Sequence, residues 1–151
     1  MRHGRSYFAQ ESLNMNEWEF KDLVLGVSAE FEVHINKEMP QMFCQLTGDE
    51  NPLHTDSKFA QDNGFKDKVV YGMLTSSFYS RLIGMYLPGK HCLLHEMKAT
   101  YLKPVYEGDI LTVRGEIVHL NDTFKQIEIK ASIHRGSDIV SRAKNKTGVL
   151  Y

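Results

Sequence analysis

The chain has 151 residues, of which 42% are hydrophobic and 25% charged, so it can bury the core of one globular domain and is not a disordered polyelectrolyte. Its 18 basic and 19 acidic residues leave a formal net charge of −1, which argues against the basic surface that nucleic-acid binding requires.

Cysteine content and hydropathy indicate the cellular compartment of the protein. Cys44 and Cys92 are too few for a disulfide framework and fit a reducing compartment. No apolar run approaches the roughly 20 residues of a membrane span, and the first residues lack the apolar block of a secretory signal. We therefore expect a cytoplasmic protein without a membrane partner.

The N-terminal third predicts an extension, a strand and a short helix. Residues 1–16 show no periodicity and are expected to form an N-terminal extension to a single domain over residues 17–151. Residues 29–35 (AEFEVHI) alternate apolar and polar side chains, which predicts a half-buried strand with His34 facing solvent. Residues 36–48 have helical spacing of apolar side chains and end at a glycine, which predicts a short helix.

A polar loop and a long helix follow. Residues 47–56 (TGDENPLHTD) contain an Asn-Pro turn signal, and a second short helix is expected over residues 57–63. The segment that begins at Gly72 has an apolar stripe and a row of small residues, and Pro88-Gly89 ends it. This pattern is typical of a helix against which other elements pack closely on more than one side.

Everything after residue 91 has the pattern of β-structure. Strands are expected over residues 92–102, 109–120, 123–134 and 139–150, with turn signals between them that favour antiparallel hairpins. Within the third, Ile127, Ile129, Ala131 and Ile133 are expected to share one face. One helix among antiparallel strands predicts an α+β fold, a curved antiparallel sheet wrapped around the long central helix.

Asp49 and His54 are separated by four residues across the Asn-Pro turn, so their side chains can converge. A carboxylate and an imidazole on one water can move its proton in either direction near neutral pH. Gly72 opens the long helix, whose first N–H groups and dipole can receive a developing oxyanion. The alternatives are that Asp49 caps a turn, that His54 is an ordinary loop residue and that Gly72 only permits a tight turn.

Three segments together resemble a known family. FCQLTGDENPLHTDSKFAQDNGF, VVYGMLTSSFYSRLIGMYLPG and MKATYLKPVYEGD resemble, in order and spacing, the MaoC-like family of (R)-specific enoyl-CoA hydratases, which are hot-dog-fold proteins. The similarity runs from about Glu19 to the last strand. It implies reversible syn hydration of a trans-2-enoyl-CoA to an (R)-3-hydroxyacyl-CoA, with the coenzyme A thioester as substrate and no other cofactor. It also implies a homodimer with the acyl tunnel near the subunit interface.

The resemblance assigns a role to individual residues. Asp49 and His54 match the pair that contacts the catalytic water, and Gly72 matches the glycine whose N–H binds the thioester oxygen. Ser80 matches a helix serine that supports the catalytic carboxylate. Tyr71 stands where the family commonly has histidine, which affects the expected thioester entrance or an orienting hydrogen bond. The residues expected to bind substrate are Asn51, Tyr71 and Met73.

Two other functions compete with hydration. Thioesterases of the same fold use a carboxylate on the central helix, but residues 72–87 contain no Asp or Glu. A non-catalytic acyl-thioester binding protein is favoured by Tyr71, although such a protein has little use for the paired Asp49 and His54.

Metal binding is not expected. His91 and His95 would share one face of a strand with Cys92 on the other, and the acidic residues of the polar loop lack EF-hand spacing. Three basic residues could meet the phosphates of coenzyme A: Lys90, Lys98 and Lys103. Three aromatic residues could contribute to a dimer interface: Tyr7, Trp18 and Phe20.

Overall fold

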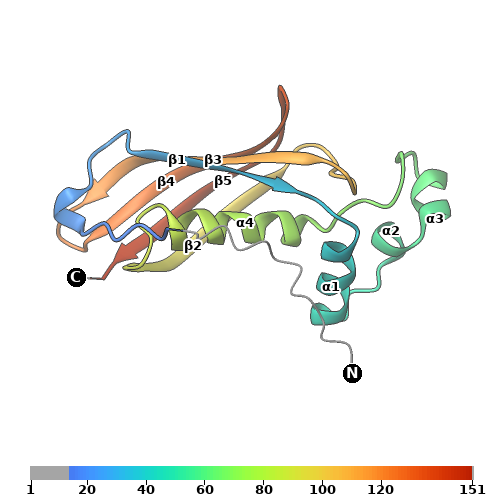
Figure 1. Ribbon diagram of the computed structural model, residues 1–151, viewed down its shortest axis with the longest axis horizontal. Helices are drawn as coiled ribbons and strands as arrows, with labels where there is room; N and C mark the ends of the chain where they lie inside the picture. The colour runs from blue at the N-terminus through green and yellow to red at the C-terminus, as the bar shows by residue number, and fades with distance from the viewer. Residues whose placement is uncertain (1–13, 151) are drawn as a thin grey trace.

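The computed structural model of the protein describes residues 14–150, which form a five-stranded antiparallel sheet and one long helix (Figure 1). The spatial strand order is β1-β3-β4-β5-β2. Helix α4 runs along the inner face of the sheet, and α1, α2 and α3 lie together beyond the sheet, near the end at which α4 begins (Figure 1). The elements are a 3-10 turn η1 (Phe20–Asp22), β1 (Ser28–His34), α1 (Glu38–Thr47), α2 (Pro52–Thr55), α3 (Ser57–Asp62), α4 (Gly72–Met85), β2 (Cys92–Tyr101), β3 (Ile110–Asn121), β4 (Gln126–Arg135) and β5 (Asp138–Val149).

The expected α+β class and the wrapped helix are confirmed, and strand alternation explains the core. Ile127, Ile129, Ala131 and Ile133 are all buried on the inner face of β4, as their period-two spacing predicts. His34 is exposed, as expected for the opposite face of β1. The sheet therefore buries one face, and α4 covers that face.

A row of small residues lets α4 approach the sheet closely. Ala29, Gly115, Ala131, Ala143 and Ala99 are register partners, one from each strand. A Cβ atom added at Gly115 would lie 2.6 Å from the Cδ2 atom of Leu82 on α4. Because this row carries no bulky side chain, the buried Leu82 can occupy the space above it.

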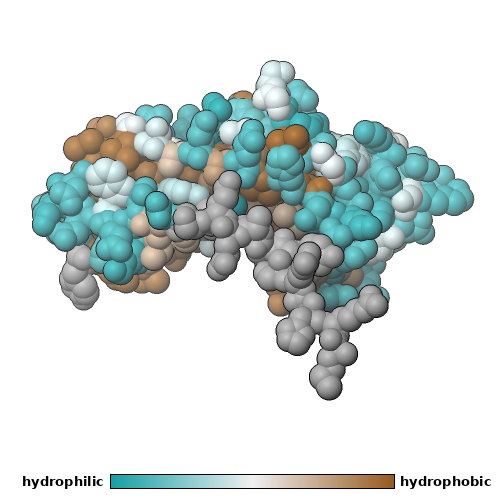
Figure 2. Space-filling view, viewed as in Figure 1, coloured by the Kyte–Doolittle hydropathy of each residue, from teal (hydrophilic) through white to brown (hydrophobic). Residues whose placement is uncertain are grey.

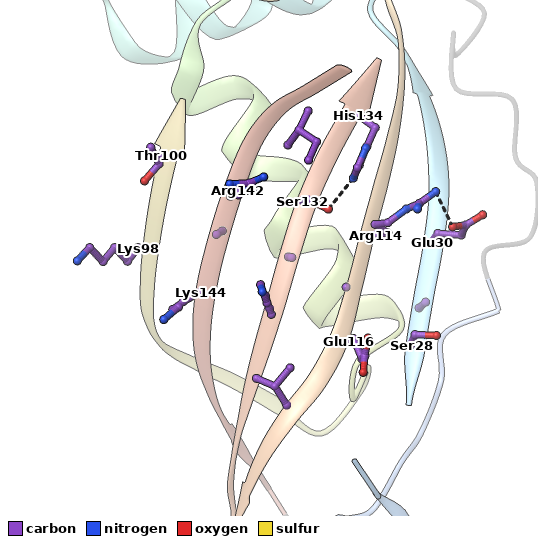
Figure 3. Close-up of a pocket in the computed structure, with 17 residues that line it drawn as sticks. Ser28, Glu30, Lys98, Thr100, Arg114, Glu116, Ser132, His134, Arg142 and Lys144 are labelled. Atoms are coloured by element: carbon purple, nitrogen blue, oxygen red, sulfur yellow. Dashed lines mark hydrogen bonds and ion pairs between the residues drawn. The ribbon is translucent and has the colours of Figure 1, made fainter. Parts of the chain in front are cut away.

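The outer face of the sheet is charged and stands opposite α4. A hollow of about 1070 Å³ there is lined by basic and acidic side chains from all five strands (Figure 3). Lys98, Lys144 and Lys130 are neighbours across three strands, while Arg114 pairs with Glu30 at 3.3 Å. None of the residues that line this hollow comes from the polar loop at residues 47–56 or from α4.

One topological expectation is wrong. The segment between β2 and β3 is not a hairpin loop, because β2 pairs with β5 at one edge and β3 pairs with β1 and β4. Turn residues at 103–109 mark a change of direction but do not specify which strand is the partner, since pairing depends on contacts distant in sequence. A second difference is α2, a single helical turn where only a loop is predicted.

Most of the expected N-terminal extension, including Tyr7, lies outside the described residues. Asn16 is bound to the chain that follows α4: its N–H donates to Met85 O at 2.8 Å, and its carbonyl accepts from Lys90 N–H at 2.8 Å. Trp18 and Phe20 are partly buried against the protein's own core. Their expected part in a dimer interface stays a prediction.

Candidate active site

The loop that carries Asp49 is held by short-range hydrogen bonds. Helix α1 ends at Gly48, whose φ of 72° is the left-handed conformation favoured by glycine. The Asp49 N–H donates to Thr47 Oγ1 at 3.2 Å, and the Asp49 carboxylate accepts from Asn51 N–H at 3.1 Å. Asn51 in turn caps α2 by accepting from Leu53 N–H at 2.9 Å. These bonds define the local path of the loop, and Asp49 itself is exposed.

His54 lies on α2 and is half-buried. Its Nδ1 atom is 2.6 Å from the carbonyl oxygen of Val69, which can only accept, so Nδ1 carries the proton in this bond. In the neutral ring the other nitrogen, Nε2, is therefore the acceptor. This arrangement selects the tautomer whose Nε2 can accept a hydrogen bond from water.

Gly72 is the first residue of α4, where backbone N–H groups have no intrahelical partner. The ring of Tyr101 lies against it, and a Cβ atom at position 72 would be 3.0 Å from Tyr101 Cε1. The Tyr101 hydroxyl is in turn hydrogen-bonded to the Ser76 hydroxyl at 2.6 Å. The absence of a side chain at Gly72 thus makes room for the Tyr101 ring against the first turn of α4.

His54 and Gly72 line the same hollow, of about 460 Å³. Its walls are mostly apolar, which suits the acyl portion of a thioester better than a charged metabolite. Lys103 also lines it. The apolar members of the lining are Leu53, Phe65, Val69, Val70, Met73, Leu102, Pro104, Val105 and Val140.

The Tyr71 side chain connects the two catalytic candidates. Its hydroxyl donates to the backbone carbonyl of Asp49 at 2.6 Å, and its ring lies against the ring of His54 with centroids 4.1 Å apart. No hydrogen bond joins the side chains of Asp49 and His54 to each other within residues 14–150. Tyr71 contacts both residues, and Asn51 also joins them, because its N–H donates to the Asp49 carboxylate and its carbonyl accepts from the His54 N–H at 2.9 Å.

The other predicted site residues differ in where they lie. Met73 is 68% exposed at the rim of the hollow, and Asn51 serves as the cap of α2. Ser80 is exposed on α4, and no hydrogen bond between Ser80 and Asp49 exists in the described part of one chain. The roles of all three stay predictions.

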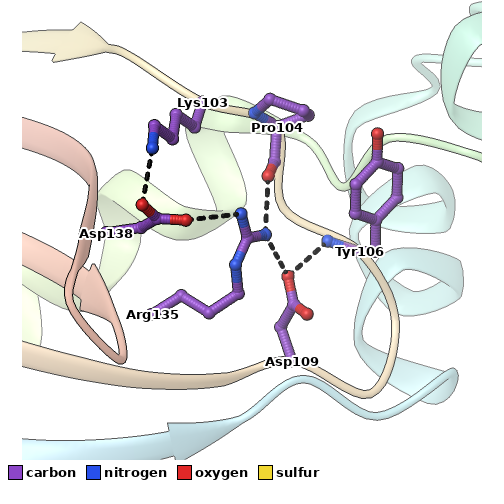
Figure 4. A network of polar contacts seen from close by, with 6 residues as sticks. All are labelled: Lys103, Pro104, Tyr106, Asp109, Arg135 and Asp138. Atoms are coloured by element: carbon purple, nitrogen blue, oxygen red, sulfur yellow. Dashed lines mark hydrogen bonds and ion pairs between the residues drawn. The ribbon is translucent and has the colours of Figure 1, made fainter. Parts of the chain in front are cut away.

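A polar network that the sequence does not reveal supports the wall of the hollow (Figure 4). The Arg135 guanidinium donates to Pro104 O at 2.9 Å and to the Asp109 carboxylate at 2.8 Å. Lys103 reaches Asp138 at 2.6 Å, and this hydrogen bond holds the pKa of Asp138 below its ordinary value. The network ties the segment between β2 and β3 to the β4–β5 turn.

That segment also supports the residue to which His54 is bound. Val70 N–H donates to Val105 O at 2.8 Å, one residue after the carbonyl that Arg135 holds. Val69, which precedes Val70, accepts the hydrogen bond from His54. Contacts that are remote in sequence therefore fix the orientation of the imidazole.

Of the lysines considered for coenzyme A phosphates, Lys98 lies on the outer face of the sheet and Lys90 pairs with Glu17 at 3.2 Å. Between residues 14 and 150 there is no group of three or more His, Cys, Asp or Glu side chains arranged to hold a metal ion. In the same part of the chain, no helix has the length and hydropathy of a membrane span.

The sheet that wraps one helix, with a histidine and a helix N-terminus at one hollow, places the protein in the class of hot-dog-fold proteins. A family model described as "MaoC like domain" matches residues 23–136, so the chain belongs to this family.

Individual relatives agree with this assignment. The chain is 32% identical over 102 residues to an (R)-specific enoyl-CoA hydratase of Aeromonas caviae, covering 68% of this chain and 76% of the relative. It is 26% identical over 121 residues to a 3-hydroxybutyryl-CoA dehydratase of Methylorubrum extorquens, covering 80% and 77%. The solved structure of an (R)-hydratase from A. caviae involved in PHA biosynthesis superposes with a TM-score of 0.81 at 27% identity, covering 85% of this chain and 98% of that one.

Proposed function

We propose that the protein catalyses the reversible hydration of a trans-2-enoyl-CoA to an (R)-3-hydroxyacyl-CoA. The observation that carries this proposal is the hollow shared by His54 and the start of α4, in which the Nδ1 bond to Val69 leaves Nε2 free to accept a hydrogen bond from the water. The relatives named as enoyl-CoA hydratase and 3-hydroxybutyryl-CoA dehydratase support a hydratase or dehydratase reaction.

In this mechanism the water is held between Asp49 and His54. Asp49 takes a proton from the water, whose oxygen forms the new bond to C3 of the enoyl thioester. Electron density moves to the thioester oxygen, where the Gly72 N–H and the dipole of α4 stabilise the enolate. The proton that Asp49 took is then delivered to C2 with the participation of His54, whose Nε2 holds the water, so that the H and OH of one water are added and both side chains return to their starting protonation states. Ser80 is proposed to hold the Asp49 carboxylate.

A second copy of the chain is part of the proposal. Asp49 is exposed in one chain, whereas a carboxylate that activates water works best where bulk solvent is excluded. Three large apolar side chains near the same end are also exposed, Leu46 at 83%, Met73 at 68% and Leu102 at 46%. By contrast, the surface over α2 and α3 is mainly hydrophilic (Figure 2). We propose that a homodimer encloses the site, which light scattering on the purified protein would test.

The decisive experiment uses crotonyl-CoA with the wild-type protein and Asp49→Asn. Loss of the conjugated enoyl thioester is followed together with the appearance of free thiol. We expect enoyl loss without thiol release in the wild type, and a fall of at least about 100-fold in the variant, because the acid-base group is lost.

Each other outcome points to a different function. Thiol release would identify a thioesterase instead. Absence of turnover with crotonyl-CoA and with longer and branched enoyl-CoAs, while ligand binding is retained, would identify a non-catalytic acyl-thioester binding protein.

A further inference from the structure

Tyr71 is a buried tyrosine that sits between two helices at the base of the candidate site. It is 2% exposed. Its ring lies between Phe43 of α1, at a centroid distance of 4.9 Å, and His54 of α2, at 4.1 Å. The Tyr71 ring thus packs against one aromatic ring from each helix, and it limits how far the imidazole can tilt.

The hydroxyl of Tyr71 fixes a different segment. It donates to the backbone carbonyl of Asp49 at 2.6 Å, across 22 positions of sequence. Burial raises the pKa of Tyr71 above its usual range, so the hydroxyl keeps its proton and stays a donor. Because the Asp49 carboxylate is bonded to the nearby Asn51 N–H, the position of this peptide unit also sets the position of the carboxylate.

Tyr71 is also joined by a peptide bond to Gly72. One residue thus touches all three groups of the proposed site: Asp49 through the hydrogen bond, His54 through the ring and Gly72 through the chain. It does not line the 460 Å³ hollow that holds Gly72, but a separate hollow of about 310 Å³ on the other side of His54. Its burial and placement suit a supporting role and do not suit contact with the acyl thioester.

We propose that Tyr71 is a positioning residue that sets the distance between Asp49 and His54. An imidazole at position 71 is shorter than a phenol, so it would not reach the Asp49 carbonyl with the backbone where it is. This inference rests on the proposed hydratase function, and it predicts an effect on catalysis that exceeds the effect on folding.

The test compares Tyr71→Phe with Tyr79→Phe. Both changes delete one buried hydroxyl, since Tyr79 is fully buried and bonds to Ser141 at 2.9 Å. For Tyr71→Phe we expect kcat with crotonyl-CoA to fall on the order of 10- to 100-fold with KM unchanged within about twofold, as for a small displacement of reacting groups. Tyr79→Phe should keep the wild-type kcat below its melting temperature.

A second variant addresses the ring. Phe43→Leu keeps the Tyr71 hydroxyl but removes support on one side of its ring. It should lower kcat in the same direction by a smaller factor. A normal kcat in both Tyr71→Phe and Phe43→Leu, with only a lower melting temperature, would overturn the proposal in favour of a structural role. A raised KM at unchanged kcat in Tyr71→Phe would overturn it in favour of substrate contact.

A readout that needs no activity separates this proposal from the hydratase function. In Tyr71→Phe the amides of Asn51, Leu53 and His54 should exchange with solvent faster, because the loop has lost its anchor, whereas Tyr79→Phe should leave them unchanged. If the wild type does not hydrate any enoyl-CoA but this exchange pattern holds, the hydratase assignment fails and the anchoring by Tyr71 stands. Unchanged exchange in Tyr71→Phe would refute the anchoring itself.

Discussion

Replacing Gly115 by alanine tests whether the row of small residues determines where α4 lies. The added Cβ would be 2.6 Å from Leu82 Cδ2 and 3.1 Å from Ile129 Cγ2, and both neighbours are fully buried. Since both side chains are buried in the core, they must leave their present positions or the helix and the sheet must move apart. Overpacking of this kind costs about 1–3 kcal/mol. For a chain of 151 residues that corresponds to a fall in melting temperature of about 2–12 °C.

Thermal and urea unfolding, followed by circular dichroism, measure this change, and Gly84→Ala provides the matched control. A Cβ at Gly84, within α4, would meet only Cys92 Sγ at 4.0 Å, an ordinary contact. Alanine there should raise stability by up to about 1 kcal/mol through helix propensity. The same chemical change should therefore have opposite signs at the two positions.

A double-mutant cycle locates the strain. Leu82→Ala alone should cost about 2–5 kcal/mol through the cavity that it leaves. In the Gly115→Ala background it should cost less, because it removes the side chain that the new Cβ meets. The reasoning is refuted if Gly115→Ala melts at or above the wild-type temperature, or if the two substitutions are additive.

Three further predictions concern polar groups outside the proposed chemistry. Arg135→Ala should lower the free energy of unfolding by about 2 kcal/mol in urea titrations, because it leaves the half-buried Asp109 carboxylate without its strongest donor; an unchanged midpoint would contradict this. Asp56→Ala should cost about 1 kcal/mol, since its carboxylate caps α3 by accepting from the N–H groups of residues 58 and 59, whereas Asp56→Asn should retain most of the stability. Burial raises the pKa of Tyr79 from 10.0 to about 12, so the folded protein keeps a proton that the unfolded chain releases. Tyr79 alone should therefore lower stability by about 2–3 kcal/mol as the pH rises from 10 to 12. Because Tyr71 adds to this fall, Tyr79→Phe should reduce it and not abolish it.

Local patterns in the sequence predict most of the elements and their faces, although not the single turn of α2. Alternation over residues 127–133 predicts the buried side of β4, and the glycine and proline that bound the long helix predict its extent to within a few residues. Short-range signals of this kind act through backbone geometry and nearest neighbours, which are the same in almost any fold. The polar loop with Asp49 and His54 is also recognisable as a candidate site, because a carboxylate and an imidazole across a turn are the residue types that acid-base chemistry requires.

Only the tertiary structure shows which strands pair and which side chains come into contact. Three contacts join residues that are far apart in the chain: the pairing of β2 with β5, the packing of Leu82 over Gly115 and the hydrogen bond from Tyr71 to Asp49. No local pattern encodes them, because a side chain's propensity and periodicity are independent of what the rest of the chain brings to it. Residue types and spacing identify Asp49 and His54 as candidates for acid-base chemistry. The contacts of Tyr71 with both residues and the hydrogen bond from His54 Nδ1 to Val69 arise only when the chain folds, because they join segments that are distant in the sequence.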